Sequence, residues 1–517
     1  MTRNQTEAET QRDVIAFLLR PESYGRAKAP VTRIDTHISV IFLVGDRAYK
    51  MKRTIRFPYL DYGTVDRRRH FCELELAVNR RTAPSLYRRV MSVTREVDGA
   101  LCLDGVGTPV EWLIEMTRFD QDTLFDRMAT ADRLTTALMT TLADSIAAFH
   151  DDAEAKAGRS GAAAMRWVVD GNNREIGERV PIMFAAQQVE HLRSHSVQAL
   201  DDVAALLDDR AVRGRLRHCH GDLHLRNICL FEGRPTLFDG VEFNEAITSI
   251  DVLYDLAFLL MDLEHRGHRD LANIVFNRYL AMTGDLDGLA AMPLFLSCRA
   301  AIRTHTTAAA ASAQPDPTVA RELEGEARAY LDLACDFLTP PPPQLIAVGG
   351  LSGTGKSTLA GRLAPLVARA PGALLLRSDV IRKRMFGVAP EAELDAAAYT
   401  SEQSAHVYAH LQRDAQTALS AGQSVITDAV FARSEERSAI EAIATKAGVP
   451  MIGLWLEAPG ATLQARVTNR TGDASDADAT VVQQQLAYDL GQVEWRRIDA
   501  SEGTEETFAA ARKVVAV

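Results

Sequence analysis

The sequence predicts two domains: an N-terminal α+β domain with a small β-rich lobe and a helical lobe, and a C-terminal α/β domain with a parallel sheet. Three observations lead to this prediction. Four consecutive prolines at positions 340–343 divide the chain of 517 residues, and such a run favours a stiff extended segment over helix or sheet. Before the prolines, β-rich segments come first and helical segments follow. After the prolines, strand and helix patterns alternate, which is typical of a parallel sheet.

The length also favours more than one domain, because single cores rarely grow beyond about 250–300 residues. We expect the first domain at residues 1–338, a proline linker at 339–343 and the second domain at 344–517. Within the first domain, the β-rich lobe covers about 25–118 and the helical lobe about 119–338.

Each predicted element follows from a local pattern. The β-branched run at 31–52 with its Gly45-Asp46 turn predicts two strands of one antiparallel hairpin. A charged helix is expected at about 66–82. The first domain then adds strands at 91–94 and 112–116, helices between 121 and 210, and further helices to 338. The second domain has predicted strands at 345–348, 373–376, 424–427 and 451–456, and a helix from Lys356.

The composition is that of an ordinary globular protein, with 47% hydrophobic and 25% charged residues. Acidic residues outnumber basic ones by 69 to 58, which argues against nucleic acid as a partner. The six cysteines are scattered, which favours reduced thiols over a disulfide framework. No apolar run approaches the roughly 18 residues of a membrane span, and the start lacks the pattern of a signal peptide. We therefore expect a cytoplasmic protein without membrane contact.

One motif in the first domain carries the residue types that phosphoryl transfer needs. It runs from His220 to Asn227 with the sequence HGDLHLRN, and Asp239 follows on the next predicted strand. Phosphoryl transfer requires a carboxylate to accept the hydroxyl proton, oxygen ligands for Mg²⁺ and a cation near the phosphates. The motif places Asp222 as the base and Asn227 with Asp239 as metal ligands.

This motif resembles that of the aminoglycoside phosphotransferase family, which implies a protein-kinase-like fold and ATP with Mg²⁺ as cofactors. The resemblance also implies a lysine of the β-rich lobe that contacts the nucleotide phosphates. Lys50 is the preferred candidate for it, and Lys52 is the second choice. Its acidic partner is Glu73 or Glu75, with preference for Glu73. The chain departs from the family pattern because no glycine-rich loop precedes Lys50; residues 36–39 form the equivalent turn.

Several other residues near this motif leave alternatives open. Asp251 and Asp255 are expected to brace the catalytic loop and to take no direct part in the chemistry. Arg299 and Arg303 lie one helical turn apart and are candidates for the acceptor pocket, against a surface or ion-pair role. A zinc cluster is a weaker alternative because the spacing lacks a second paired set of ligands. Its residues would be His218, Cys219, His220, His224 and Cys229.

The second domain begins with a P-loop, Gly350-Leu-Ser-Gly-Thr-Gly-Lys-Ser357, which follows a strand and opens a helix. Glycines let backbone N–H groups wrap the phosphates, and the helix N-terminus favours negative charge. Lys356 is expected on the β- and γ-phosphates, and Ser357 on Mg²⁺. The predicted nucleotide-binding set is Gly350, Ser352, Gly353, Thr354, Gly355, Lys356, Ser357 and Thr358.

Later residues favour a small kinase over an ATPase or a GTPase. Asp379 and Arg382 follow the second predicted strand, and Asp428 ends the third, where it suits a contact with magnesium-bound water or with the acceptor. Arg466 and Arg470 lie on one helix face. This part resembles the gluconate kinase, zeta-toxin and polynucleotide kinase group of P-loop NTPases. The resemblance implies Asp379 as the base, Arg382 on an anionic group of the acceptor, and both later arginines on the transferred charge.

The whole chain resembles bacterial bifunctional proteins that join an aminoglycoside phosphotransferase-like domain to an ATP-binding domain. We therefore expect an ATP- and Mg²⁺-dependent phosphotransferase with two kinase modules, each acting on a hydroxyl of a small molecule such as a sugar, polyol or nucleoside. Two alternatives remain open. One module regulates the other, or the second module is a zeta-toxin-like or polynucleotide 5′-kinase. The motifs do not identify either acceptor.

Overall fold

The computed structural model describes residues 3–25, 30–57, 60–469 and 474–516. The chain divides into two compact units. The first contains residues 1–159 and 211–256, and the second contains residues 160–210 and 257–517. None of the described helices is both long and apolar enough to cross a membrane.

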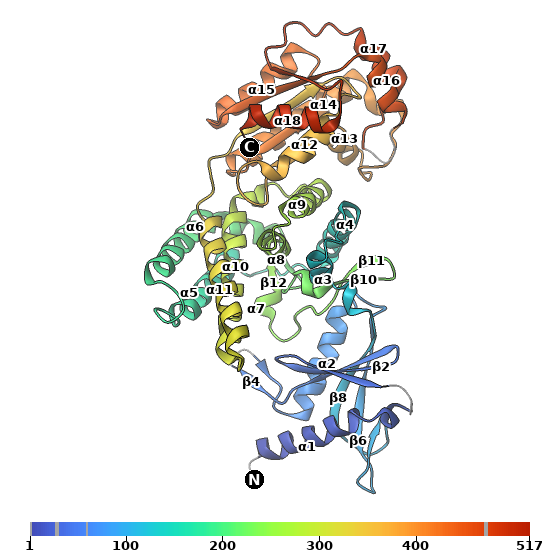
Figure 1. The fold of residues 1–517 in the computed structure, drawn as a ribbon, viewed down its shortest axis with the longest axis vertical. Helices are drawn as coiled ribbons and strands as arrows, with labels where there is room; N and C mark the ends of the chain where they lie inside the picture. Colours follow the sequence, from blue (N-terminus) through green and yellow to red (C-terminus); the bar gives the residue numbers. More distant parts are fainter. Residues whose placement is uncertain (1–2, 26–29, 58–59, 470–473, 517) are drawn as a thin grey trace. The chain divides into compact units, whose positions relative to one another are not determined.

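The first unit is built on a six-stranded antiparallel sheet with the order β1-β2-β3-β8-β6-β7 (Figure 1). Helix α1 (Arg3–Leu18) packs Val14 and Leu18 on one face, and α2 (Val65–Asn79) packs Cys72 on the other. The strands are β1 (Val31–Asp35), β2 (Ser39–Val44), β3 (Arg47–Lys52), β6 (Tyr87–Arg95), β7 (Leu101–Leu103) and β8 (Thr108–Thr117).

The run at 31–52 forms three strands, so the prediction of a single two-stranded hairpin is wrong. The Gly45-Asp46 turn lies between β2 and β3 as predicted, with Val44 opposite Arg47. A second turn separates β1 from β2, because the Thr36 hydroxyl accepts a hydrogen bond from the Ser39 backbone N–H at 2.9 Å. Such side-chain turns stop a strand without glycine or proline. Helix α2 begins and ends close to its predicted bounds.

The HGDLHLRN motif lies among short strands in the same unit. Strand β9 (Leu216–His218) precedes the motif and pairs with β12 (Ser249–Asp251), while β10 (Ile228–Phe231) and β11 (Arg234–Leu237) form a hairpin directly after it. The remaining helices of this unit are α3 (Phe125–Thr130), α4 (Thr136–Asp152), α7 (Glu245–Thr248) and the start of α8 (Val252–His265). The segment from 220 to 239 is therefore held at both ends by paired strands.

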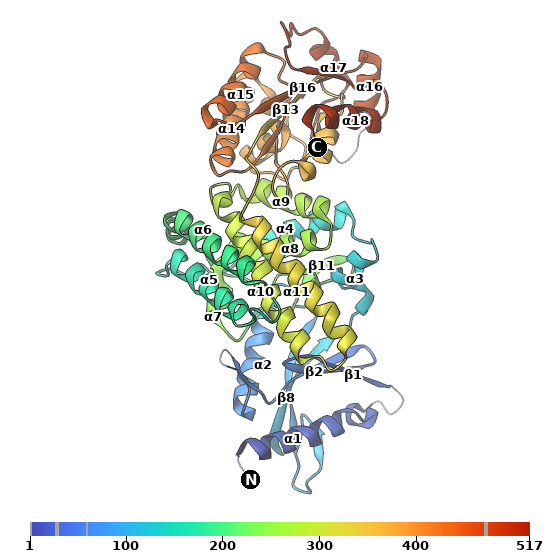
Figure 2. The same ribbon diagram turned by 60° about the vertical axis from the view of Figure 1, so that its left-hand side comes forward.

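The second unit contains a group of helices and a parallel sheet (Figure 2). The long helix α10 packs against α11 and α5. The helices of this group are α5 (Gly161–Gly177), α6 (Ala186–Val212), α9 (Arg269–Thr283), α10 (Met292–Ala313) and α11 (Pro317–Phe337). A buried ion pair joins Arg210 of α6 to Asp285 at 2.6 Å. The prolines at 340–343 lie outside helix and strand, between α11 and β13.

The sheet after the prolines is entirely parallel, with the order β14-β15-β13-β16-β17. Its strands are β13 (Leu345–Gly350), β14 (Leu374–Arg377), β15 (Val425–Asp428), β16 (Met451–Glu457) and β17 (Arg496–Asp499). Helices α12 (Lys356–Leu363) and α18 (Thr504–Val515) share a buried core with it, while α14 (Ser401–Ser420) contacts β14 and β15. The predicted α/β class is thus confirmed. The first strand lies at the centre, so the loop after it opens where neighbouring strands end, which is the usual ligand position in open α/β sheets.

Close packing at Gly453 of β16 gives a test of this sheet. A Cβ atom there would lie 2.3 Å from Trp495, so we expect Gly453→Ala to lower the free energy of unfolding by about 1–3 kcal/mol through overpacking. Calorimetric unfolding of the full chain measures the effect. Gly361→Ala is the matched control, because a Cβ there meets nothing within 4 Å and alanine favours a helix by up to about 1 kcal/mol. Equal effects of the two changes would contradict the packing.

Candidate active sites

One buried carboxylate, that of Asp255, holds the backbone of the HGDLHLRN loop by hydrogen bonds. Asp255 accepts hydrogen bonds from the backbone N–H groups of His220, at 3.0 Å, and Gly221, at 2.9 Å. His150 contacts the same carboxylate at 3.2 Å. Gly221 has φ +83°, a value that favours glycine. Asp255 therefore braces the loop, as the sequence predicts, whereas the Asp251 carboxylate accepts the backbone N–H of Leu253.

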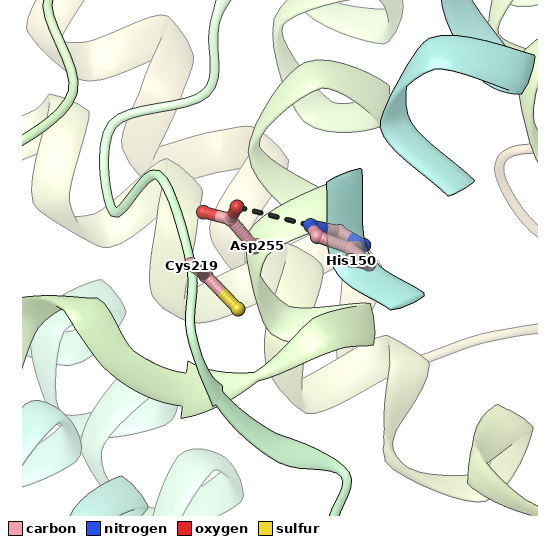
Figure 3. A group of neighbouring side chains, drawn as sticks. All are labelled: His150, Cys219 and Asp255. Carbon is pink, nitrogen blue, oxygen red and sulfur yellow. Dashed lines mark hydrogen bonds and ion pairs between the residues drawn. The ribbon is translucent and has the colours of Figure 1, made fainter. Parts of the chain in front are cut away.

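The zinc alternative finds no support in the geometry. Among the described residues, the ligand-type side chains that gather within 4.8 Å are His150, Cys219 and Asp255 (Figure 3). Of these, only Cys219 belongs to the predicted cluster. The Asp255 oxygens are already engaged by the loop backbone and by His150. His220 hydrogen-bonds the carbonyl of Phe238 at 3.0 Å, so it orients the loop.

Asp222 and Asn227 lie together at the ends of the loop. The Asn227 amide nitrogen donates to the Asp222 carboxylate at 2.8 Å and to its backbone carbonyl at 2.9 Å. The carbonyl oxygen of the same side chain is therefore the atom that would face a cation. His224 approaches the Asp222 carboxylate at 3.3 Å. The Asp222 side chain is 39% exposed, so a substrate hydroxyl can reach it.

Hydrogen bonds join this loop to the one that carries Asp239. Phe238 donates to the Asn227 carbonyl, and Val241 donates to the His220 carbonyl, each at 3.0 Å. Asp239 has φ +60°, a region that, apart from glycine, short polar residues such as Asp and Asn tolerate best. The predicted base and both predicted metal ligands therefore lie on two adjoining loops. Carboxylate and amide oxygens fit the donor preference of Mg²⁺.

The N-lobe lysine contacts Glu75, and the preference for Glu73 is wrong. Lys50 lies 2.7 Å from the Glu75 carboxylate and 2.5 Å from that of Asp239. Glu73 lies on another side of α2, about half exposed, and pairs with Arg69. The signal that identifies Glu75 is helical phase, since the buried residues of α2 are Arg68, Cys72, Glu75 and Asn79.

The charge of this ion pair is strongly stabilised. Burial alone would raise the pKa of Glu75, but Lys50 and Lys52 outweigh it and lower that pKa to about 2. Burial likewise favours the neutral form of Lys50, yet Asp239 and Glu75 raise its pKa above the ordinary value. Lys50 therefore carries a full positive charge at the place predicted for the nucleotide phosphates.

Glu242 and Tyr62 also belong to this cluster, and neither was found from the sequence. Lys52, the second-choice lysine, lies 2.6 Å from the other Glu75 oxygen and 2.5 Å from Glu242. The Tyr62 hydroxyl donates to the same Glu242 oxygen at 2.7 Å. Glu242 comes three residues after Asp239, and this spacing was the only signal available. Both lysines are thus engaged by carboxylates, and Lys52 is the more buried of the two.

The predicted acceptor arginines lie on α10. Arg299 is buried, with its guanidinium 4.7 Å from the ring centre of Phe258, and Arg303 lies 5.5 Å from that of Tyr330. Both stack on aromatic rings within the second unit. Their role toward an acceptor stays a prediction.

In the second domain, the P-loop glycines have backbone angles that other residues resist. Gly350, Gly353 and Gly355 have φ values of +140°, +86° and +88°. A Cβ on Gly353 would lie 2.6 Å from the carbonyl oxygen of Leu463. This glycine cradle fits a phosphate chain, as its sequence predicts. Residues 352–358 all line one cavity of about 1170 Å³.

Side chains around the loop complete the site. The Lys356 ammonium donates to the carbonyl of Leu351 at 3.0 Å, so it lies over the loop. The Ser357 hydroxyl donates to Asp428 at 2.6 Å. Arg377 donates to both, to Ser357 at 3.0 Å and to Asp428 at 3.2 Å. This pair of hydroxyl and carboxylate oxygens is a donor set suited to Mg²⁺. The contact of Arg377 with both groups was not predicted from the sequence.

Asp379 lines the same cavity and is a stronger base than an ordinary aspartate. Burial, and then the charge of Asp428, raises its pKa above the usual value, although Arg377 and Lys356 oppose the shift. An acid whose pKa is raised toward neutrality is better matched to proton transfer.

The predicted arginines have different positions. Arg382 lines the cavity, is 7% exposed and donates to the Ala398 carbonyl at 2.6 Å, while its Nε has no partner among the described residues. Arg466 also lines the cavity, but it donates to the carbonyls of Ala500 and Glu502, each at 2.8 Å. Arg470 lies outside the described residues.

Two family models match the chain. Residues 96–293 match the one described as "Phosphotransferase enzyme family", and residues 345–489 match "AAA domain". These matches confirm the predicted combination of an aminoglycoside phosphotransferase-like domain with a P-loop domain.

Known relatives cover nearly all of the chain or one part of it. Uncharacterized proteins of Mycobacterium tuberculosis and Mycobacterium bovis are 28% identical over 490 residues, which is 92% of this chain and 94% of theirs. Among solved structures, a sugar kinase from Janibacter sp. is 20% identical with a TM-score of 0.26, over 34% of this chain and 96% of its own. A choline/ethanolamine kinase family protein from Mesorhizobium loti is 12% identical with a TM-score of 0.40, over 64% and 99%.

The Glu75 ion pair predicts a pH-dependent stability. Because the folded-state pKa of Glu75 is lowered to about 2, its stabilisation is present above the unfolded pKa and is lost as pH falls toward 2. The shift corresponds to about 3 kcal/mol. We expect Glu75→Gln to lower the free energy of unfolding by this order at pH 7, with a difference that shrinks only below the unfolded pKa of about 4.3, measured by urea unfolding.

Glu73→Gln is the matched control on the same helix. Its exposed pair with Arg69 contributes about 0.5 kcal/mol or less, so its unfolding curve should follow that of the unmodified chain. A larger effect for Glu73→Gln than for Glu75→Gln would overturn the assignment of Glu75 as the partner of Lys50.

Proposed function

We propose that this chain, an ATP-dependent kinase by its domain families, has two active modules that each transfer a phosphoryl group to a hydroxyl of a small molecule. One observation supports the proposal most: each domain has its own candidate base, its own oxygen donors for Mg²⁺ and its own buried or loop-bound cation. A module that only bound nucleotide for regulation would not need a base beside its metal ligands.

In the first module, Lys50 would hold the nucleotide phosphates, and the Asn227 carbonyl oxygen and Asp239 would hold Mg²⁺. The bound metal and nucleotide supply charge neutralisation and the phosphoryl group. Asp222 accepts the proton of the acceptor hydroxyl. Asn227 donates to that carboxylate at 2.8 Å, which keeps it oriented, and Asp255 fixes the loop beneath it. Correct positioning is the main requirement of this reaction.

In the second module, the backbone N–H groups of the P-loop and Lys356 would bind the phosphates, and Ser357 with Asp428 would hold Mg²⁺. Asp379 takes the proton from the acceptor. Arg382, whose Nε has no partner among the described residues, would bind a carboxylate or phosphate of the acceptor. We also assign Arg466 to the transferred charge, which requires that it leave the carbonyls it now contacts.

The cavity supports a small acceptor beside the nucleotide. Its volume of about 1170 Å³ exceeds the range of about 300–1,000 Å³ that is common for a single small-molecule site. A sugar, polyol or nucleoside is small enough to fit in this cavity beside the nucleotide. A polynucleotide end or a nucleotide sugar would place the module with the two alternative kinases, and the assays below separate these outcomes.

Variants that inactivate one module at a time test the proposal. We expect Asp222→Asn to abolish phosphorylation of one acceptor, and Lys356→Ala that of another, in a screen of radiolabelled ATP against a metabolite library. Removal of a catalytic base reduces the rate by about 10²–10⁴-fold. DNA and RNA 5′ ends are included as acceptors.

The result for each variant has a clear reading. If Lys356→Ala removes all products and Asp222→Asn removes none of them, the first module is not catalytic. Loss of every product with either variant alone would favour regulation of one module by the other. Label on nucleic acid ends would move the second module to the polynucleotide kinases.

The raised pKa of Asp379 predicts the pH dependence of the second module. Because the base must be ionised, the rate should rise with pH through a pKa above the ordinary aspartate value of about 3.9. Asp379→Asn should remove this acid limb and reduce the rate by about 10²–10⁴-fold. The rate is measured against pH in the Asp222→Asn background, where only the second module acts.

A stability measurement accompanies this prediction. The folded protein disfavours the charged form of Asp379, so its contribution to stability falls as pH rises, and Asp379→Asn should not lower the thermal unfolding temperature at pH 7. Asp395→Asn changes an exposed carboxylate of the same domain and should leave both rate and stability unaltered. An unchanged acid limb in Asp379→Asn would exclude this residue as the base.

A further inference from the structure

The carboxylate of Glu75 is shared between two lysines of one strand. Lys50 contacts one oxygen at 2.7 Å, and Lys52 contacts the other at 2.6 Å. Residues 50 and 52 lie on the same face of β3, because side chains of a strand alternate. Glu75 therefore does not depend on Lys50 alone for charge compensation.

The two lysines also reach the same loop at two points. Lys50 contacts Asp239 at 2.5 Å, and Lys52 contacts Glu242 at 2.5 Å. Tyr62 donates its hydroxyl to the same Glu242 oxygen at 2.7 Å. Strand β3, helix α2 and the loop at 239–242 are thus joined by two parallel sets of ion pairs.

These two sets differ in their access to solvent. Asp239 has a side chain that is 45% exposed, whereas Lys52 and Glu242 are 1% and 6% exposed. The exposed set is the one assigned above to the nucleotide and its metal. When Asp239 and Lys50 take up those partners, the contact between them must weaken. A buried carboxylate that loses its partner is strongly destabilising.

We propose that Lys52, Glu242 and Tyr62 are positioning residues that hold Glu75 and the Asp239 loop in place while Lys50 and Asp239 engage the nucleotide and Mg²⁺. This inference rests on the proposed function of the first module. Lys52 keeps Glu75 compensated after Lys50 turns to the phosphates. Glu242 keeps the loop anchored, three residues from the metal ligand, after Asp239 turns to the metal.

The test measures nucleotide binding by the full chain in a Lys356→Ala background, where the second module no longer dominates binding. Titration calorimetry gives the affinity for ATP with and without Mg²⁺. We expect Lys52→Met and Glu242→Gln each to weaken binding of Mg·ATP by about 10–100-fold, the range for residues that support metal ligands. Binding of ATP without metal should change much less. Lys52→Arg, which keeps the charge, should restore part of the affinity.

Thermal unfolding separates positioning from simple loss of structure. If Lys52→Met lowers the unfolding temperature but leaves the Mg·ATP affinity within about twofold of the background, the inference is wrong. Tyr62→Phe covers the case in which the larger changes do not fold, because it removes only the hydroxyl on Glu242. It should weaken Mg·ATP binding selectively, and no selective change would overturn the inference. If the Lys356→Ala background itself binds no Mg·ATP, the proposed function of the first module fails, and the inference fails with it.

Discussion

Burial of one negative charge, on Glu75, organises the first candidate site. A buried carboxylate needs cationic partners, and strand β3 supplies two at positions 50 and 52. Those lysines in turn need acids, and the loop after β11 supplies Asp239 and Glu242. The charge requirement therefore links strand β3, helix α2 and the loop at 239–242, which are far apart in sequence. The positions of the predicted metal ligand and the predicted phosphate cation follow from it.

The second site obtains the positive potential that nucleotide phosphates require from backbone groups, without a buried pair of lysines among its described residues. Its phosphate cradle is formed by backbone N–H groups around glycines with positive φ, and such a loop needs no buried acid to hold it. Asp428 ends β15, and Asp379 lies in the first turn of helix α13 (Ser378–Met385), directly after the neighbouring parallel strand β14. Their mutual repulsion contributes to the raised pKa of Asp379. Parallel topology thus brings the candidate base near the predicted metal ligand, whose carboxylate also pairs with Arg377 at 3.2 Å.

Features that a contiguous motif encodes were predictable from the sequence. The HGDLHLRN loop, the P-loop and the alternation of strands and helices all lie in short segments with strong patterns. The choice between Glu73 and Glu75 required the phase of α2: two residues along a helix turn the side chain by about 200°, so only one of them faces the sheet. Glu242 and Tyr62 carry no pattern of their own, because their roles arise only when distant segments meet. The turn at 36–39 was expected only as the equivalent of a glycine-rich loop. It was not used to divide the run at 31–52 into three strands, because a hydroxyl makes it, with no glycine or proline.

The two candidate bases show how the domains differ in physical strategy. Asp222 is partly exposed and is oriented by Asn227, on a loop whose backbone Asp255 holds by hydrogen bonds. Asp379 has a raised pKa because its surroundings disfavour its charge. The first arrangement depends on the position of the carboxylate, and the second depends on its basicity as well. A chain that uses both arrangements need not have modules with the same pH range, since their bases are tuned by separate environments.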